Sequence, residues 1–239
     1  MISDILRQLY SELPSTVRLV AVSKFHPFEA IEEAYAAGQR VFAESRPQEL
    51  LAKVRRLEEV RLERGEPDYM ADVQWHFIGH LQTNKLKMVL PYVSLVQSVD
   101  SIRLLDAIQN WAASNGRIVN VLLEPHVAAE ETKQGFVADE IYSILSVASQ
   151  VASVNDPAPY SHICFRGIMG MATFTDDQEV VSADFAALRT IFDTCRSQFP
   201  ALASDFTELS IGMSDDYPLA IEYGSTMVRI GSKIFGARI

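Results

Sequence analysis

The sequence predicts a protein of the α/β class that folds as a closed (β/α)8 barrel. Short apolar, β-branched runs alternate with longer segments of helical spacing, giving eight units, the number that such a barrel needs. The apolar runs lack strict polar alternation, which indicates parallel strands covered on both faces. A doubly wound dinucleotide fold would have a glycine-rich turn after the first run, whereas this chain has residues 23–27, SKFHP. We therefore expect residues 1–239 to form one barrel domain with an extra N-terminal helix at Ile2–Glu12.

The first half contains four predicted strands, each followed by a predicted helix. We expect strands at 17–24, 40–45, 73–79 and 95–100, and helices at 27–37, 48–63, 84–89 and 101–114. Gly38 and Gly116 follow two of these helices, as glycine does at helix ends, and Ser101 is a suitable N-cap. The many charges between Lys53 and Arg64 predict a solvated helix face.

The second half repeats the pattern. We expect strands at 117–124, 162–173, 207–213 and 227–230, and helices at 139–154, 177–199 and 217–223. Residues 65–72 and 155–161 are predicted to be surface loops within the domain. No linker or low-complexity tract separates the two halves, which favours a single barrel.

The charge balance argues against two classes of partner. Lys and Arg number 21 against 31 for Asp and Glu, a formal charge of −10, which repels nucleic-acid phosphates and anionic lipid. No apolar run approaches the ~18 residues of a membrane span, and the N-terminus lacks a signal layout. Cys164 and Cys195 cannot make a disulfide framework, and we expect both to be small core residues. We therefore expect a cytoplasmic protein without a nucleic-acid or membrane partner.

Lys24 is the most informative residue at a predicted strand end. In these barrels the chemistry lies at the C-terminal ends of the strands. Lysine is rare at the end of a buried strand, because desolvation of its ammonium is costly. A neutral lysine amine there can form a Schiff base with an aldehyde. The alternative is that Lys24 forms an ion pair with Glu44, and its position alone leaves both interpretations open.

A second signal follows the seventh and eighth predicted strands. Loops there commonly bind phosphate through backbone N–H groups and hydroxyls, and Ser214, Gly231 and Ser232 are suited to this. We expect Asp215 and Asp216 to begin the following helix rather than to face a phosphate. The alternative is that Gly231 is only a turn residue. Because strands eight and one are neighbours in a closed barrel, Lys24 and this phosphate site would share one ligand. An aldehyde and a phosphate together describe pyridoxal 5′-phosphate (PLP).

A metal site is not expected. His76, His80 and Glu44 belong to separate strand ends without helical spacing, and alternation turns His76 away from the other two.

Seven segments together resemble the YggS/PROSC family of pyridoxal phosphate homeostasis proteins over nearly the full length of the chain. They are residues 21–24 (AVSK), 75–85 (WHFIGHLQTNK), 98–101 (SVDS), 130–136 (EETKQGF), 167–171 (GIMGM), 212–216 (GMSDD) and 224–232 (GSTMVRIGS). The resemblance implies a fold-type III barrel like the N-terminal domain of alanine racemase.

The resemblance also implies a cofactor site. Lys24 would hold PLP as a Schiff base, Arg229 would face the pyridine nitrogen, and the hydroxyl and glycine segments would hold the phosphate. The implied site residues are Lys24, Ser45, Met213, Ser214, Arg229, Gly231 and Ser232. Two segments depart from the family: Ala43-Glu44-Ser45 replaces Gly-Glu-Asn, and Pro125-His126 replaces Val-Asn. Ser45 puts in doubt a side-chain contact carried by the family's Asn amide, and Pro125-His126 alters the pocket rim without touching the linkage to Lys24.

Two functions follow from this reading. The first is a PLP-binding protein of intracellular vitamin B6 homeostasis, expected to be a monomer, that delivers the cofactor to apo-enzymes. The second is a fold-type III amino-acid racemase, which needs two acid/base groups on opposite faces of the bound substrate. The usual second group is a tyrosine from a β-rich domain, for which the chain, ending at Ile239, leaves no room. We expect Tyr217 and Tyr223 to lie on a helix instead. These points favour the first function, without efficient turnover.

Overall fold

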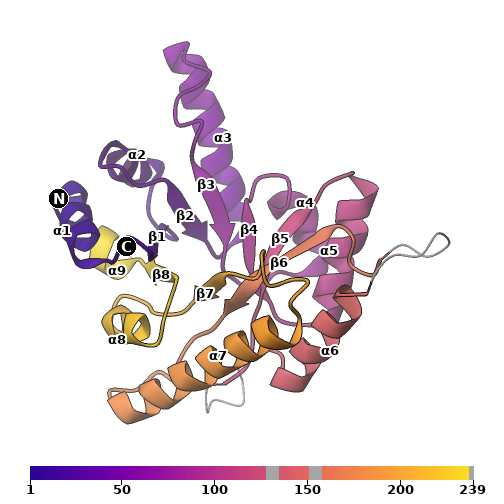
Figure 1. Ribbon diagram of the computed structural model, residues 1–239. Coiled ribbons are helices and arrows are strands. Elements are labelled where there is room, and N and C mark those ends of the chain that lie inside the picture. The colour runs from indigo at the N-terminus through magenta and orange to yellow at the C-terminus, as the bar shows by residue number, and fades with distance from the viewer. Residues whose placement is uncertain (128–134, 151–157, 237–239) are drawn as a thin grey trace.

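Eight parallel strands close into a barrel in the computed structural model, which describes residues 1–127, 135–150 and 158–236 (Figure 1). The strands follow one another around the barrel in chain order, and β8 pairs with β1, with Arg229 opposite Val20. The predicted fold class is confirmed. The strands are β1 (Arg18–Val22), β2 (Val41–Glu44), β3 (Gln74–Phe77), β4 (Leu95–Val99), β5 (Val119–Leu123), β6 (Ile163–Met169), β7 (Glu208–Ser210) and β8 (Met227–Ile230).

Helices surround the strands in the described part of the chain (Figure 1). The predicted N-terminal helix has the expected bounds, and Ser101 caps its helix by accepting the Leu104 N–H. The helices are α1 (Ile2–Glu12), α2 (Phe28–Ala36), α3 (Pro47–Arg64), η1 (Thr83–Lys85), α4 (Leu86–Val89), α5 (Ile102–Ser114), α6 (Ala138–Ala148), α7 (Gln178–Gln198), α8 (Tyr217–Glu222) and α9 (Ser232–Phe235).

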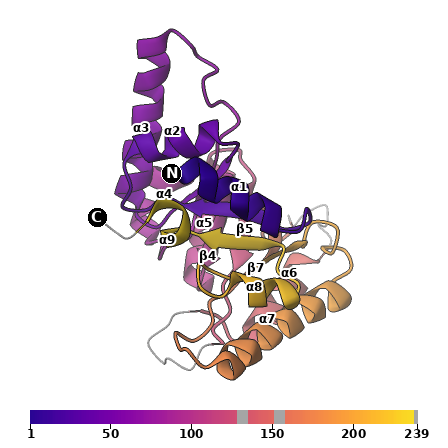
Figure 2. The ribbon, with the colours of Figure 1, turned by 90° about the vertical axis from the view of Figure 1, so that its left-hand side faces the viewer.

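The first and last helices lie side by side. In Figure 2, α1, α8 and α9 lie together on the face toward the viewer. The Tyr217 hydroxyl of α8 donates to Glu12 of α1 at 2.6 Å, and Lys233 of α9 donates to the same hydroxyl at 2.9 Å. Tyr217 therefore lies on a helix, as predicted, with its hydroxyl bound to α1 and α9.

Side chains alternate between the barrel interior and the layer under the helices. One set of Val, Ala, Leu and Met residues fills the interior, and a larger apolar cluster joins the outer strand faces to the helices. Because both faces are covered, the strands read as nearly continuous apolar runs. The interior set is Val20, Val22, Val41, Ala43, Leu95, Leu122, Met169 and Met227.

Several predicted boundaries differ from the structure. β1 ends at Val22, so Lys24 lies in the following turn and not on the strand. α6 ends at Ala148, six residues before the predicted end. Residues 151–157, which belong to the predicted helix and to the loop predicted after it, lie outside the described residues. The four-residue α9 was not predicted.

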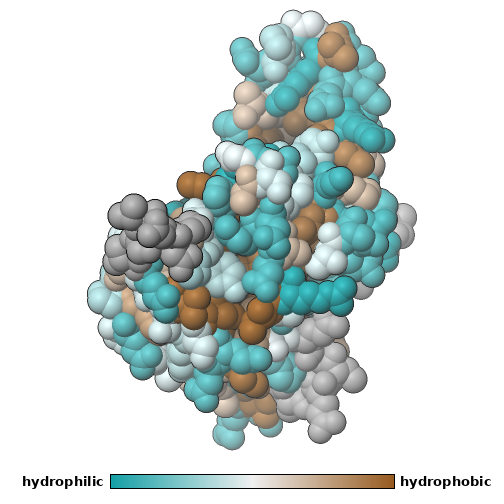
Figure 3. Space-filling model, turned by 90° about the vertical axis from the view of Figure 1, so that its right-hand side faces the viewer, coloured by the Kyte–Doolittle hydropathy of each residue, from teal (hydrophilic) through white to brown (hydrophobic). Residues whose placement is uncertain are grey.

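The charged helix α3 is exposed along most of one face. Its outer end projects from the barrel in Figure 1, and the corresponding top of Figure 3 is largely hydrophilic. The predicted solvated face is correct for Arg55 but wrong for Lys53, which is only 6% exposed. In the described ranges, no helix combines the length and apolarity needed to cross a membrane.

Candidate cofactor site

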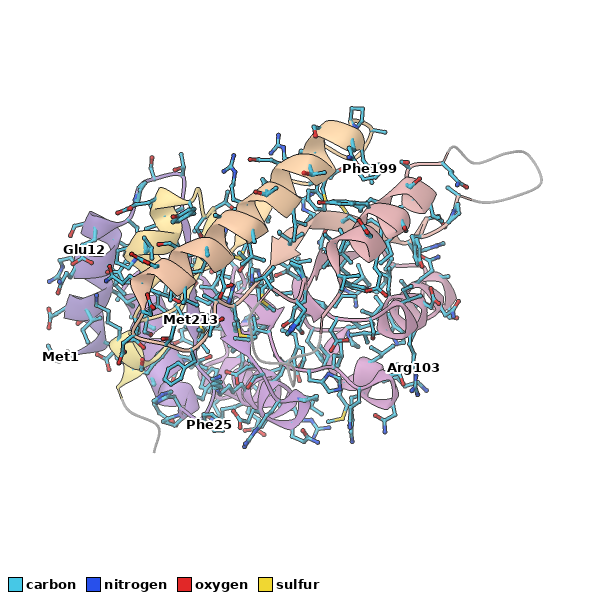
Figure 4. The ribbon with its side chains drawn as sticks, turned by 90° about the horizontal axis from the view of Figure 1, so that it is seen from below. Met1, Glu12, Phe25, Arg103, Phe199 and Met213 are labelled. Atoms are coloured by element: carbon cyan, nitrogen blue, oxygen red, sulfur yellow. The ribbon has the colours of Figure 1, made fainter. Side chains whose placement is uncertain are left out.

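Lys24 lies at the mouth formed by the C-terminal ends of the strands. It is half-buried and is the second residue after β1. Figure 4 shows its neighbour Phe25 on the same lower side as Arg103, which follows β4, whereas Phe199 at the end of α7 lies on the opposite side. The structure therefore places Lys24 where ligands bind in such barrels.

Glu44 does not pair with Lys24. Its carboxylate accepts a hydrogen bond from the Ser23 hydroxyl at 2.6 Å and forms an ion pair with Lys53 of α3. Glu44 and Phe42 are two residues apart on β2, so both side chains point outward from the barrel. The contacts of Glu44 therefore lie between β2 and α3. The alternative interpretation of Lys24, as an ion-pair partner of Glu44, is wrong.

The closing seam of the barrel brings three of the predicted phosphate residues beside the Lys24 turn. Ala21 of β1 lies opposite Ile230 of β8, so Gly231 and Ser232 continue next to the end of β1. The Gly231 N–H donates to the Ser214 hydroxyl at 3.3 Å, which joins the ends of β7 and β8. A Cβ at Gly231 would lie 3.0 Å from the Val22 carbonyl oxygen, so only glycine fits without a shift.

Arg229 is a buried cation at this seam. Its side chain points into the barrel and the residue is 4% exposed. The guanidinium donates to the Ser210 carbonyl and hydroxyl at 2.6 and 2.8 Å, and to the Gly170 carbonyl at 2.9 Å. Burial lowers its pKa to about 10, which leaves it charged at neutral pH. In the described part of the chain, no carboxylate lies within ion-pair distance of it.

A chain of hydrogen-bonded, buried polar side chains runs from Arg229 through the barrel interior. The Ser210 hydroxyl, which accepts from Arg229, donates to Gln97 Oε1 at 2.7 Å, and Gln97 Nε2 donates to His76 Nδ1 at 2.8 Å. Burial lowers the pKa of His76 to about 3, so this ring is a neutral acceptor. The side chains come from β3, β4, β7 and β8 and fix the guanidinium in the middle of the barrel.

The sequence analysis did not find Gln97 and Ser210 as parts of this site. Each is a polar residue inside a strand that is otherwise buried and apolar. A polar residue in a doubly covered strand requires a buried hydrogen-bond partner. This requirement could have marked Gln97 and Ser210 as members of a buried polar network, but it does not identify their hydrogen-bond partners.

Glu124 lies at the mouth on the far side from Lys24, directly after β5. Burial first, and then the charge of Asp100, raise its pKa to about 7, against the opposing effect of Arg229. Asp100 itself accepts from the His80 ring at 2.9 Å and from the Ser101 hydroxyl at 3.0 Å. The mouth therefore combines a buried cation with a carboxyl group that gains and loses a proton near neutral pH.

We predict that Glu124 makes the stability of the ligand-free protein depend on pH. Because its pKa rises from 4.5 to about 7 on folding, the folded chain holds a proton that the unfolded chain releases. The stability therefore falls as the pH rises through this window. Glu124→Gln is expected to melt above the native protein at pH 8 and close to it at pH 5. Thermal unfolding followed by circular dichroism measures this, with the exposed Glu58→Gln as control; equal shifts at both pH values would contradict it.

Ser45 and Met213 lie at the rim. Ser45 directly follows β2, and its carbonyl oxygen would be only 2.1 Å from a Cβ at Gly79, so the loops after β2 and β3 pack backbone to backbone. Met213 is 37% exposed, and its N–H donates to Asp216, the residue before α8. Asp215 and Asp216 are expected to begin the following helix, whereas α8 begins at Tyr217, with Asp216 directly before it. The structure brings five of the predicted site residues to one seam, and Ser45 and Met213 lie farther out. The five are Lys24, Ser214, Arg229, Gly231 and Ser232.

The residues weighed as metal ligands are separated. His76 contacts Gln97 inside the barrel, His80 pairs with Asp100 at the mouth, and Glu44 lies behind the sheet. Over the residues that the structure describes, no three His, Cys, Asp or Glu side chains are grouped to hold a metal.

Comparison with known proteins identifies the family. Residues 2–239 match the family model described as alanine racemase, N-terminal domain. A pyridoxal phosphate homeostasis protein from Haemophilus influenzae is 35% identical over 224 residues, covering 94% of this chain and 86% of the relative. The chain belongs to the pyridoxal phosphate homeostasis proteins of the alanine racemase N-terminal domain family.

A further relative and two solved structures are also similar to this chain. The human protein of the same name is 36% identical over 227 residues, covering 92% of this chain and 76% of the relative. PipY of Synechococcus elongatus, solved with PLP bound, is 35% identical, with a TM-score of 0.84 and coverage of 99% of this chain and 100% of PipY. An alanine racemase from Clostridium difficile has a TM-score of 0.71 at 13% identity, and this chain covers 56% of it. The racemase shares the fold.

Proposed function

We propose that this protein binds PLP at the seam between β1 and β8 and takes part in intracellular PLP homeostasis. The observation that carries the proposal is the buried guanidinium of Arg229, which has no carboxylate within ion-pair distance among the described residues, although Glu124 and Asp216 act on it from farther away. The guanidinium lies at the same seam as Gly231 and Lys24. The printed names of the relatives and the PLP-bound PipY structure support it.

The residues present fit the chemical groups of PLP. The backbone N–H of Gly231 and the hydroxyls of Ser214 and Ser232 are the donors that a phosphate accepts. When bound, the cofactor supplies an aldehyde that forms a Schiff base with a lysine amine, here that of Lys24. A pyridine nitrogen is an acceptor for a guanidinium that keeps its own protons, and Arg229 fills that role.

We further propose that the protein is a carrier that passes PLP to apo-enzymes in the cytoplasm. The relatives are named for homeostasis rather than for a reaction, which supports this role. Arg229 also supports it, because an unprotonated ring nitrogen is a weak electron sink. The net charge of −10 argues against competing binding to nucleic acid.

A visible absorbance titration of the purified protein tests the proposal. Added PLP is expected to develop the long-wavelength band of a Schiff base, and an added amino acid is expected to shift this band by competing for the aldehyde. Lys87→Ala, which removes an exposed lysine of α4, is the control and should behave like the native protein. Absence of the band in the native protein would contradict the proposed function.

Gly231→Ala is predicted to weaken PLP binding through the phosphate. The added Cβ would lie 3.0 Å from the Val22 carbonyl oxygen and 3.2 Å from Val22 Cβ, so the end of β8 must move away from β1. We expect about a tenfold rise in Kd, corresponding to the loss of one charge-assisted hydrogen bond. Titration with PLP and with phosphate-free pyridoxal measures the effect. A similar loss for pyridoxal would show that Gly231 does not act on the phosphate.

A further inference from the structure

One face of α3 holds the backbone on both sides of Lys24. Before it, the Ser23 carbonyl accepts a hydrogen bond from Lys53 Nζ at 2.7 Å. After it, the Phe25 N–H donates to Glu49 Oε2 at 2.9 Å. Lys53 and Glu49 are four residues apart, so they lie one above the other on the same helix face. The two peptide groups flanking Lys24 are therefore bound by one rigid element outside the barrel.

The contact before Lys24 belongs to a buried ion pair. The Lys53 side chain is 8% exposed, that of Glu44 is 0% exposed, and the Ser23 hydroxyl donates to the same Glu44 oxygen that Lys53 contacts. Burial raises the pKa of Glu44, and Lys53 opposes the shift. Glu44 Oε2 is buried without a hydrogen-bond partner. Replacing a buried ion pair by apolar residues of similar volume is often neutral or stabilising, so the pair is weak evidence for a role in stability.

The contact after Lys24 holds a strained residue. Phe25 has a φ of +68°, a left-handed conformation that residues with a Cβ rarely adopt. Besides the bond to Glu49, the Arg46 guanidinium lies over its ring at 4.5 Å. The next ring, His26, stacks on Phe235 of α9 at 5.1 Å. The strained turn is therefore held by contacts from Arg46, Glu49 and Phe235.

We propose that Glu44, Glu49 and Lys53 are positioning residues that fix the Lys24 turn so that the amine meets the aldehyde of PLP. The inference rests on the proposed function and deepens it. Lys53 and Glu44 lie behind the sheet and act through the backbone of Ser23, and Glu49 acts through Phe25. They are expected to affect the formation of the covalent bond and to leave the phosphate and ring contacts unchanged.

Two ligands separate these effects. PLP can form the Schiff base, whereas 4′-deoxypyridoxine 5′-phosphate lacks the aldehyde and binds through its ring and phosphate alone. Lys53→Met and Glu49→Ala are each expected to weaken PLP about tenfold and to leave the Kd of the deoxy analogue within about twofold. Arg55→Met removes an exposed cation of the same helix and is the matched control for Lys53→Met. Absorbance follows PLP, and protein fluorescence follows the analogue.

Two further measurements separate positioning from general damage. Glu49→Gln keeps an oxygen that can accept the Phe25 N–H, so it is expected to bind PLP like the native protein. Hydrogen exchange in the ligand-free protein is expected to be faster at residues 23–28 in Lys53→Met and Glu49→Ala, and unchanged in β4. Glu49 is partly exposed, so Glu49→Ala decides the question if Lys53→Met does not fold.

The outcomes of this experiment are distinct. Equal weakening of both ligands, or no weakening of PLP in a folded Glu49→Ala, would overturn the positioning role. A native protein that binds the deoxy analogue and PLP equally and develops no Schiff-base band would instead overturn the proposed function. Selective loss of PLP affinity, restored in Glu49→Gln, supports both.

Discussion

Replacement of Lys24 by alanine is expected to abolish the covalent linkage to PLP and to leave measurable non-covalent binding. Lys24 supplies the only amine implied for the linkage, whereas the phosphate donors come from the ends of β7 and β8 and Arg229 comes from within β8. Each hydrogen bond to a charged group contributes about 1.5–3 kcal/mol. Several such bonds keep the affinity of the variant in a measurable range.

Absorbance and equilibrium dialysis test this prediction together. The long-wavelength band should vanish in Lys24→Ala, while dialysis still detects bound PLP. Phosphate-free pyridoxal should bind the variant much more weakly than PLP does. If pyridoxal bound as well as the phosphate ester, the role assigned to Ser214, Gly231 and Ser232 would be wrong.

The PLP-loaded protein is expected to have at most trace racemase, transaminase or decarboxylase turnover. In the proposed site Arg229 would keep the ring nitrogen without a proton, so negative charge developing at the α-carbon of an amino acid would be poorly delocalised. A second positioned acid/base group is also needed, and the Tyr217 hydroxyl is bound to Glu12 and Lys233. Loss of one such group typically lowers the rate about 10²–10⁴-fold.

An exchange assay with α-deuterated amino acids and a racemisation assay measure this turnover. A panel of small, acidic and aromatic amino acids covers the substrates of this reaction class, and Lys24→Ala is the blank. A racemisation rate near that of a typical enzyme, about 10 per second, that disappears in Lys24→Ala would contradict the carrier function. The protein would then be assigned as a racemase.

The order and type of the main elements could be predicted from the sequence because most strands are nearly continuous apolar runs and some helices are marked by an N-cap residue or a following glycine. Ser101 and Asp177 precede helices that begin where expected, and both side chains accept backbone N–H groups. The helix α9 was missed because four residues are too short for a helical period to appear. The end of α6 was placed too late because apolar residues continue after Ala148.

The site could be predicted only in part. Lys24 was placed on the strand because the extended run continues through Ser23, and the left-handed turn at Phe25 leaves no mark in a phenylalanine. Lys53 was assigned to a solvated face because its neighbours are charged. Its burial depends on how α3 lies on β2, which local sequence does not encode. The chain from Arg229 to His76 likewise depends on four strands meeting inside the barrel.

The seam between β1 and β8 also determines when the site exists during synthesis. Lys24 leaves the ribosome early, but Arg229 and Gly231 emerge only with the last strand, and β8 must still pair with β1. A nascent chain therefore cannot capture the cofactor in advance. If PLP binds at the proposed seam, it binds the closed barrel and not the open chain, so free cofactor is expected to raise the stability of finished molecules by mass action. The proposed function therefore implies that cellular vitamin B6 supply and the lifetime of this protein are coupled.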